Sequence, residues 1–234
     1  MKHGFAYLSQ NRFLSVPNDA STKPFGVAGI PYDGAVTNRP GARFAPAAIR
    51  QASQMLCDGI HPFFNTSPYE FIRDLGDLAT PNTDLTAMRA SLAEQVPALL
   101  AQYHMCWLGG DHSITLGLLR AYRAWAGQPL AVLHFDAHCD TWEDHFGEPS
   151  GHGTWVYEAI TEGLVDPESF VQVGIRSAGV REAREYVRDQ GGVIFTARDL
   201  RGLESEGQLS EVIQTIRQRL SAKGLPVYLT LDID

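Results

Sequence analysis

Leu133-His134-Phe135-Asp136-Ala137-His138-Cys139-Asp140-Thr141 is the stretch that decides the fold, because it joins a strand to a group of potential metal ligands. The apolar run 129–133 leading into it predicts a buried strand. In extended backbone alternate side chains share a face, so we expect Asp136, His138 and Asp140 to project together. Burying two carboxylates and an imidazole on one side of a strand end is unfavourable unless a cation accompanies them. A divalent metal ion is the simplest such cation.

The composition indicates an ordinary globular protein. The chain has 234 residues, 44% of them hydrophobic and 20% charged, so a single domain over 1–234 is expected. A formal net charge of -8, without a Lys/Arg-rich stripe, excludes nucleic acid as the expected partner. The three cysteines form no C-x-x-C pair, which argues against a disulfide framework and a cysteine-type zinc site.

No part of the sequence has the pattern of a membrane segment. The N-terminus lacks a continuous apolar region and an evident cleavage site, and no run approaches ~18 uninterrupted apolar residues. We therefore expect no membrane partner and a cytoplasmic location.

Hydrophobic patterning predicts strands that alternate with helices along most of the chain. The strands are expected at 25–30, 71–75, 104–108, 129–135, 170–175, 192–195 and 226–231. The helices are expected at 46–56, 85–100, 114–125, 154–162, 179–189 and 207–222. Pro97 predicts a kink or an early end of the helix at 85–100. Residues 1–24, with several breakers, are expected to form an N-terminal arm or surface loop.

This alternation predicts the α/β class, with a mostly parallel central sheet covered by helices on both faces as a three-layer αβα sandwich. In such sheets ligands gather at the carboxyl ends of the strands. Segments rich in functional side chains follow predicted strands at 31–46, 109–113, 136–140 and 232–234. We expect them to converge at one rim of the sheet.

Six side chains in these segments form the expected metal site. They are His112, Asp136, His138, Asp140, Asp232 and Asp234. A carboxylate-rich set without thiolates suits Mn²⁺ better than structural zinc, and six ligands exceed the need of one ion. We expect two Mn²⁺ ions with a bridging hydroxide as the nucleophile.

Each of these residue patterns also has an ordinary structural interpretation. A lone Asp-x-Asp is more often a turn or a cap, and a lone His after Gly-Gly is more often a neighbour of a helix cap. His104 and His145 lack any ligand context and are expected to be surface or structural residues. Cys139 is expected to pack on the face opposite the ligands.

Four blocks of the sequence resemble the signatures of the ureohydrolases, the arginase–agmatinase family. They are Gly-Gly-Asp-His-Ser at 109–113, Asp-Ala-His-Cys-Asp at 136–140, His-Gly-Thr at 152–154 and Leu-Asp-Ile-Asp at 231–234. The loop from Gly29 through Asn38-Arg-Pro-Gly-Ala-Arg-Phe to Arg50 resembles the agmatinase branch. The resemblance covers the chain from about residue 25 onward and implies an arginase-like fold.

The resemblance also implies roles for individual residues. One Mn²⁺ would be held by His112, Asp136, Asp140 and Asp232. The other would be held by His138, Asp136, Asp232 and Asp234, with Asp136 and Asp232 bridging. His152 matches the histidine that shuttles a proton as the tetrahedral intermediate breaks down.

The implied reaction is hydrolysis of a guanidinium group to urea and an amine. Agmatine giving putrescine, a step of polyamine biosynthesis, is the favoured case, in a homo-oligomer that is a trimer or a hexamer. The family continues beyond Leu-Asp-Ile-Asp with further helices, a strand and a glutamate that anchors the guanidinium. We therefore expect this chain to be a partial sequence with its C-terminal part missing.

Two alternatives stay open. A related enzyme could take guanidinobutyrate or guanidinopropionate, whose carboxylate would need a cationic partner such as Arg39 or Arg43; these two arginines can equally be structural. A non-catalytic homologue with a regulatory role is the second alternative, favoured by the absence of the family's C-terminal part.

Overall fold

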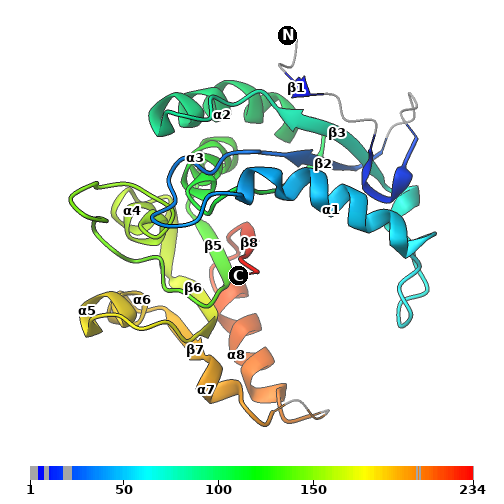
Figure 1. The fold of residues 1–234 in the computed structure, drawn as a ribbon. Helices are drawn as coiled ribbons and strands as arrows, with labels where there is room; N and C mark the ends of the chain where they lie inside the picture. Colours follow the sequence, from blue (N-terminus) through cyan, green and yellow to red (C-terminus); the bar gives the residue numbers. More distant parts are fainter. Residues whose placement is uncertain (1–4, 8–10, 18–22, 204, 206, 234) are drawn as a thin grey trace. The chain divides into compact units, whose positions relative to one another are not determined.

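The structure, a computed structural model, describes residues 5–7, 11–17, 23–203, 205 and 207–233 (Figure 1). The chain divides into two compact units, 1–121 and 122–234. Each unit contains a four-stranded sheet whose strands, apart from β1, run parallel to their neighbours. The predicted α/β class with parallel strands is thereby confirmed. The single domain over 1–234 stays a prediction.

The first unit is built on a sheet of order β1-β3-β2-β4. Its strands are β1 (Phe5–Tyr7), β2 (Phe25–Gly29), β3 (Ile72–Leu78) and β4 (His104–Leu108). Its helices are α1 (Ala45–Ser53), α2 (Leu85–Leu100) and the start of α3 (Ile114–Ala126), with short 3₁₀ turns at Phe13–Ser15, Ala42–Phe44, Gln54–Leu56 and Pro68–Glu70. Figure 1 shows α1 and α2 on opposite sides of β2 and β3.

The second unit is built on a sheet of order β7-β6-β5-β8. Its strands are β5 (Leu130–Phe135), β6 (Val165–Ile175), β7 (Val193–Thr196) and β8 (Val227–Leu231). Its helices are α4 (Trp155–Thr161), α5 (Arg181–Arg184), α6 (Tyr186–Asp189), α7 (Ala197–Leu200) and α8 (Ser210–Ser221). Leu130, Ala131 and Val132 of β5 are fully or almost fully buried, as the apolar run predicted.

The described part of the N-terminal segment differs from the expected surface loop. β1 pairs antiparallel with β3, and Leu14 and Val16 are 2% and 1% exposed. The two side chains belong to a core cluster with Val27, Ile72 and Leu108. The breakers in this segment hid its apolar residues, which reach the core singly rather than in a periodic run.

The helix predicted at 85–100 is confirmed as α2, but it does not end early at Pro97. Val96, Leu99 and Leu100 are buried, and their packing outweighs one missing backbone donor. The helix predicted at 179–189 is divided into α5 and α6 at Glu185.

The strand β8 lies at the edge of its sheet, beside β5. Its side chains Val227, Leu229 and Leu231 are 51%, 61% and 62% exposed, so one face of this edge strand presents a row of apolar groups.

Among the described residues, no helix combines the length and the apolar character needed to cross a membrane.

Candidate metal centre

The predicted ligand segment begins where β5 ends, at Phe135. The backbone then bends, because Ala137 O accepts hydrogen bonds of 2.9 Å from the amides of Arg176 and Ser177 at the end of β6. Asp140 lies in the left-handed region, with φ of 53°. The expected strand-like alternation through 136–140 is therefore wrong, although Asp136 and Asp140 still come together.

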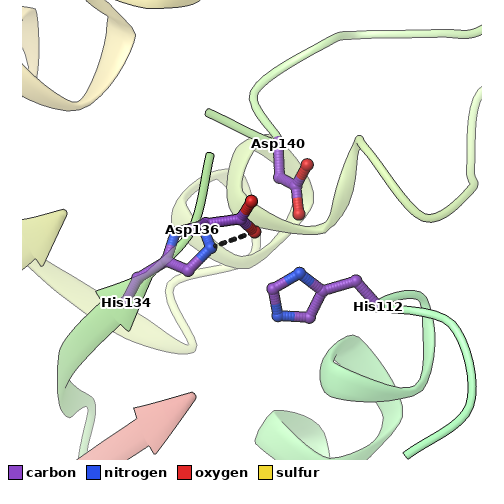
Figure 2. Close-up of side chains that lie close together, drawn as sticks. All are labelled: His112, His134, Asp136 and Asp140. Carbon is purple, nitrogen blue, oxygen red and sulfur yellow. Dashed lines mark hydrogen bonds and ion pairs between the residues drawn. The ribbon is translucent and has the colours of Figure 1, made fainter. Parts of the chain in front are cut away.

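Figure 2 shows the cluster at this point. Within the second unit, one ligand atom each from His134, Asp136 and Asp140 lies within 4.8 Å of the others. Asp136 and Asp140 are 4% and 6% exposed, and His134 is fully buried. His134, on β5, was not predicted as a site residue; its position two residues before Asp136 in the strand was the available signal.

Trp155, the first residue of α4, orients Asp140. Its indole Nε1 donates a hydrogen bond of 2.7 Å to Asp140 Oδ2. The amide of Val156 donates to Asp140 O at 3.0 Å, so the start of α4 is fixed to the ligand segment by side chain and backbone. The sequence offered no spacing signal for Trp155, because its contact depends on how the loop 141–154 folds back.

Two further predicted ligands, His138 and Asp232, lie beside the end of β5. His138 Nδ1 is 3.3 Å from Asp136 Oδ1, its amide donates to the same oxygen at 2.7 Å, and its side chain is 50% exposed. Asp232 follows β8, and its amide donates to Phe135 O at 2.9 Å, so its backbone lies beside the end of β5. Asp234 lies outside the described residues.

His152 lies in the turn that precedes α4, and its ring stacks on His145 with centroids 5.4 Å apart. Burial, followed by the proximity of His152, lowers the pKa of His145 below its usual value. This lowering of the pKa favours the neutral form of the His145 imidazole. His145 was expected to be a surface or structural residue, and nothing in the sequence indicated this stacking on His152.

In the first unit, the turn after β4 holds the backbone on both sides of His112. Asp111 Oδ1 accepts from the amide of Ser113 at 2.9 Å, and Asp111 Oδ2 accepts from the amide of Ala35 at 3.0 Å. Asp111 thus caps the start of α3 and joins it to the loop 31–46. Gly110 lies against this loop: its amide donates to Ile30 O at 3.1 Å.

A side chain at Gly110 has no room in this turn. A Cβ atom there would lie 1.9 Å from Tyr32 O, a backbone atom. We expect Gly110→Ala to lower the free energy of unfolding by about 1–3 kcal/mol, the usual cost of overpacking. At the adjacent Gly109, the nearest atom is the Ile114 Cδ1 methyl at 3.0 Å, which can move. Denaturant unfolding of both variants tests this, and equal losses would contradict it.

Arg43, a possible partner for a substrate carboxylate, is engaged with Asp33. Asp33 is 1% exposed and accepts from Arg43 Nε at 2.5 Å and from the amide of Gly41 at 2.6 Å. The hydrogen bond from the Arg43 side chain holds the pKa of Asp33 below its usual value. These contacts support the structural role for Arg43 and leave Arg39, which is exposed in the same loop, as the other candidate.

The donor set at the end of β5 suits a divalent cation. Buried carboxylates of like charge repel one another unless a cation or hydrogen-bond donors compensate them. Carboxylate oxygens and imidazole nitrogens are the ligands of harder divalent ions such as Mn²⁺. Cys139, 1% exposed, is not in the cluster, and burial raises the pKa of its thiol, which agrees with a packing role.

The fold and the site define an α/β protein with a candidate metal centre. A His/Asp cluster that could hold a metal ion lies at the carboxyl end of a parallel strand. A family model described as "Arginase family" matches residues 23–234. The chain belongs to the arginase family.

Individual relatives agree with the family. The chain is 38% identical over 218 residues to an agmatinase of Chromobacterium violaceum, covering 89% of this chain and 62% of the relative. It is 37% identical over 240 residues to an agmatinase of Cronobacter sakazakii, covering 99% of this chain and 70% of the relative. The chain thus spans about two thirds of the length of these relatives, and less than that for the first.

Solved structures give the same assignment. The proclavaminate amidino hydrolase of Streptomyces clavuligerus is similar with a TM-score of 0.83 and 32% identity, covering 97% of this chain and 74% of that one. A hypothetical agmatinase from Burkholderia thailandensis is similar with a TM-score of 0.79 and 32% identity, covering 95% and 68%. Both likenesses support the arginase-like fold.

Proposed function

We propose that the protein is a hydrolase that releases urea from a guanidino compound, with agmatine as substrate and putrescine as product. The observation that carries this proposal is the group of Asp136, Asp140 and imidazole nitrogens at the carboxyl end of β5, in a chain 38% identical to an agmatinase. A guanidinium carbon is a poor electrophile, so its hydrolysis needs a strong, well-oriented nucleophile.

The proposed cofactor is a pair of Mn²⁺ ions. The residues that would hold them are His112, Asp136, His138, Asp140, Asp232 and Asp234. When bound, such ions lower the pKa of water so that hydroxide is available at neutral pH. Four carboxylates would balance two dications and leave the buried site close to neutral.

His152 is proposed to give a proton to the amine that leaves. An amine is a poor leaving group until it is protonated, and a histidine in reach can act as the general acid. The stacking of His152 on the ring of His145 restricts the positions that the His152 ring can adopt. This restriction supports a role in proton transfer, since a general acid must be held near the atom it protonates.

Replacing His152 tests that role. We expect His152→Ala to lower turnover by about 10²–10⁴-fold, the usual contribution of a general acid or base, while the Mn²⁺ content stays unchanged. Urea release and metal analysis of the purified protein measure the two quantities. His104, the first residue of β4, has an exposed side chain. His104→Ala is therefore the matched control and should behave as the wild type. Loss of metal from His152→Ala would assign His152 to the metal site instead.

The substrate is tested by comparing urea release from agmatine with that from guanidinobutyrate in Mn²⁺-loaded protein of natural length. The rival, hydrolysis of a guanidino acid, is favoured by exposed Arg39 in the loop 31–46. Faster turnover of agmatine supports the proposal. Faster turnover of guanidinobutyrate, reduced by Arg39→Ala, supports the rival.

A non-catalytic regulatory role is the remaining alternative, and the absence of urea from every guanidino compound would favour it. We propose a homo-oligomer, trimer or hexamer, which light scattering would test. We also propose a cytoplasmic location, supported by three unpaired cysteines, Cys57, Cys106 and Cys139.

A further inference from the structure

His134 is a fully buried histidine on β5 to which the proposed reaction gives no role. It lies two residues before Asp136 and directly opposite Gln172 in the parallel pairing of β5 with β6. The rings of Trp155 and Phe170 lie edge-on to it, with centroids at 5.0 and 6.3 Å. These contacts fix the plane of the imidazole, so the direction in which each ring nitrogen points is also fixed.

A chain of hydrogen bonds runs from the backbone through Gln172 and His134 to Asp136. Gln172 Nε2 lies 2.8 Å from Cys139 O and 3.1 Å from His134 Nδ1. On the other side of the imidazole ring, His134 Nε2 lies 2.8 Å from Asp136 Oδ2. Gln172 is fully buried and Asp136 is 4% exposed, so the chain is shielded from water.

The first member of this chain determines the direction of the others. Cys139 O can only accept, so the group of Gln172 that faces it must be the NH₂ donor. The same NH₂ group therefore donates to His134 Nδ1, which accepts. Turning the amide over would set two oxygens against each other, even though Gln172 Oε1 has no hydrogen-bond partner in the part of the chain that the structure describes.

With Nδ1 as the acceptor, the proton of a neutral His134 is on Nε2. Nε2 then donates to Asp136 Oδ2, and a protonated ring nitrogen has no lone pair to offer a cation. Asp136 Oδ1 accepts from the amide of His138 at 2.7 Å, so each oxygen of this carboxylate has a donor. The carboxylate is therefore fixed at both of its oxygens, and each oxygen retains a lone pair for a metal ion.

We propose that His134 and Gln172 are positioning residues that orient the carboxylate of Asp136 for metal binding, with His134 acting as a hydrogen-bond donor and not as a ligand. This proposal rests on the metal site of the proposed function. Ligand carboxylates at metal centres are themselves hydrogen-bonded, and loss of such a partner commonly weakens metal binding by about 10–100-fold.

The experiment is a Mn²⁺ titration of the metal-free, full-length protein, with free Mn²⁺ followed by electron paramagnetic resonance. We expect His134→Leu and Gln172→Leu each to weaken binding by about 10–100-fold. The double variant should be no weaker than His134→Leu alone, because Gln172 acts through His134. Gln214→Leu, on the exposed surface of α8, is the control for a Gln-to-Leu change and should bind as the wild type.

His134→Gln separates a donor from a ligand. The side-chain amide of glutamine can donate to Asp136 and accept from Gln172, but its nitrogen has no free lone pair for a metal ion. Binding within a few-fold of the wild type is therefore expected. If His134→Gln loses as much affinity as His134→Leu while Gln172→Leu binds normally, His134 is a ligand and the proposal fails. Normal binding by His134→Leu overturns it as well.

A second measurement does not depend on metal or on folding of the variants. In ¹⁵N NMR of the metal-free wild-type protein, His134 should carry its proton on Nε2, with Nδ1 unprotonated. A proton on Nδ1 would overturn the proposed direction of the hydrogen bonds. If the wild-type protein binds no divalent ion although His134 has the expected tautomer, the proposed function fails and the internal hydrogen-bond chain stands without a metal role.

Discussion

Asp136→Ala should abolish both metal binding and urea release. Asp136 is 4% exposed, accepts hydrogen bonds on both oxygens and lies at the centre of the candidate metal site. Its removal leaves an alanine methyl group that cannot ligate, in a place that solvent does not readily reach. We expect Mn²⁺ affinity to fall by more than about 100-fold, beyond the usual effect of losing a partner that only orients a ligand.

Metal analysis and Mn²⁺ titration measure this loss directly, and urea release measures its consequence. Asp189→Ala is a suitable control, because Asp189 is half exposed and its ion pair with Arg181 is 3.8 Å long. The control should retain metal and activity. If Asp136→Ala keeps its Mn²⁺, the ions are bound elsewhere and the proposed site is wrong.

Arg50→Met should lower the free energy of unfolding by about 3–5 kcal/mol, the cost of removing one partner from a buried ion pair. The Arg50 side chain is fully buried in the first unit. Its guanidinium donates to Asp74 Oδ2 at 2.8 Å, to Asp77 Oδ1 at 2.5 Å and to Gly76 O at 2.9 Å. Without Arg50, the carboxylates of Asp74 and Asp77 stay buried without their main counter-charge.

Urea denaturation of the metal-free protein measures this effect apart from metal binding. Arg181→Met removes a guanidinium of 67% exposure with a long ion pair, and should change stability by no more than about 0.5 kcal/mol. Similar losses in the two variants would show that the burial of Arg50 is not what makes it important.

The local patterns predicted the strands and helices well, because a buried parallel strand leaves a dense apolar run in the sequence. β4 matches its predicted bounds, and β5 begins one residue later than expected. Isolated contacts were not predictable. Leu14 and Val16 join the core from a segment without periodicity, and Pro97 stays helical because its neighbours are buried.

The candidate site was predicted unevenly for a similar reason. Asp136 and Asp140 belong to one five-residue motif at 136–140, so a metal-binding role could be predicted for them without a structure. His134, Gln172 and Trp155 act through contacts with those two residues. Gln172 is 38 positions from His134, and only the register of β5 against β6 brings them together. A single sequence contains no record of that register.

The indole of Trp155 touches Asp140 directly, and this contact makes the tryptophan a built-in optical reporter of the site. Its Nε1–H group donates to a proposed ligand oxygen at 2.7 Å, so Trp155 would be close to a paramagnetic ion bound there. Loading with Mn²⁺ should therefore quench the emission of Trp155, and the diamagnetic ion Mg²⁺ should not quench it. Occupancy could then be followed in a cuvette without any label.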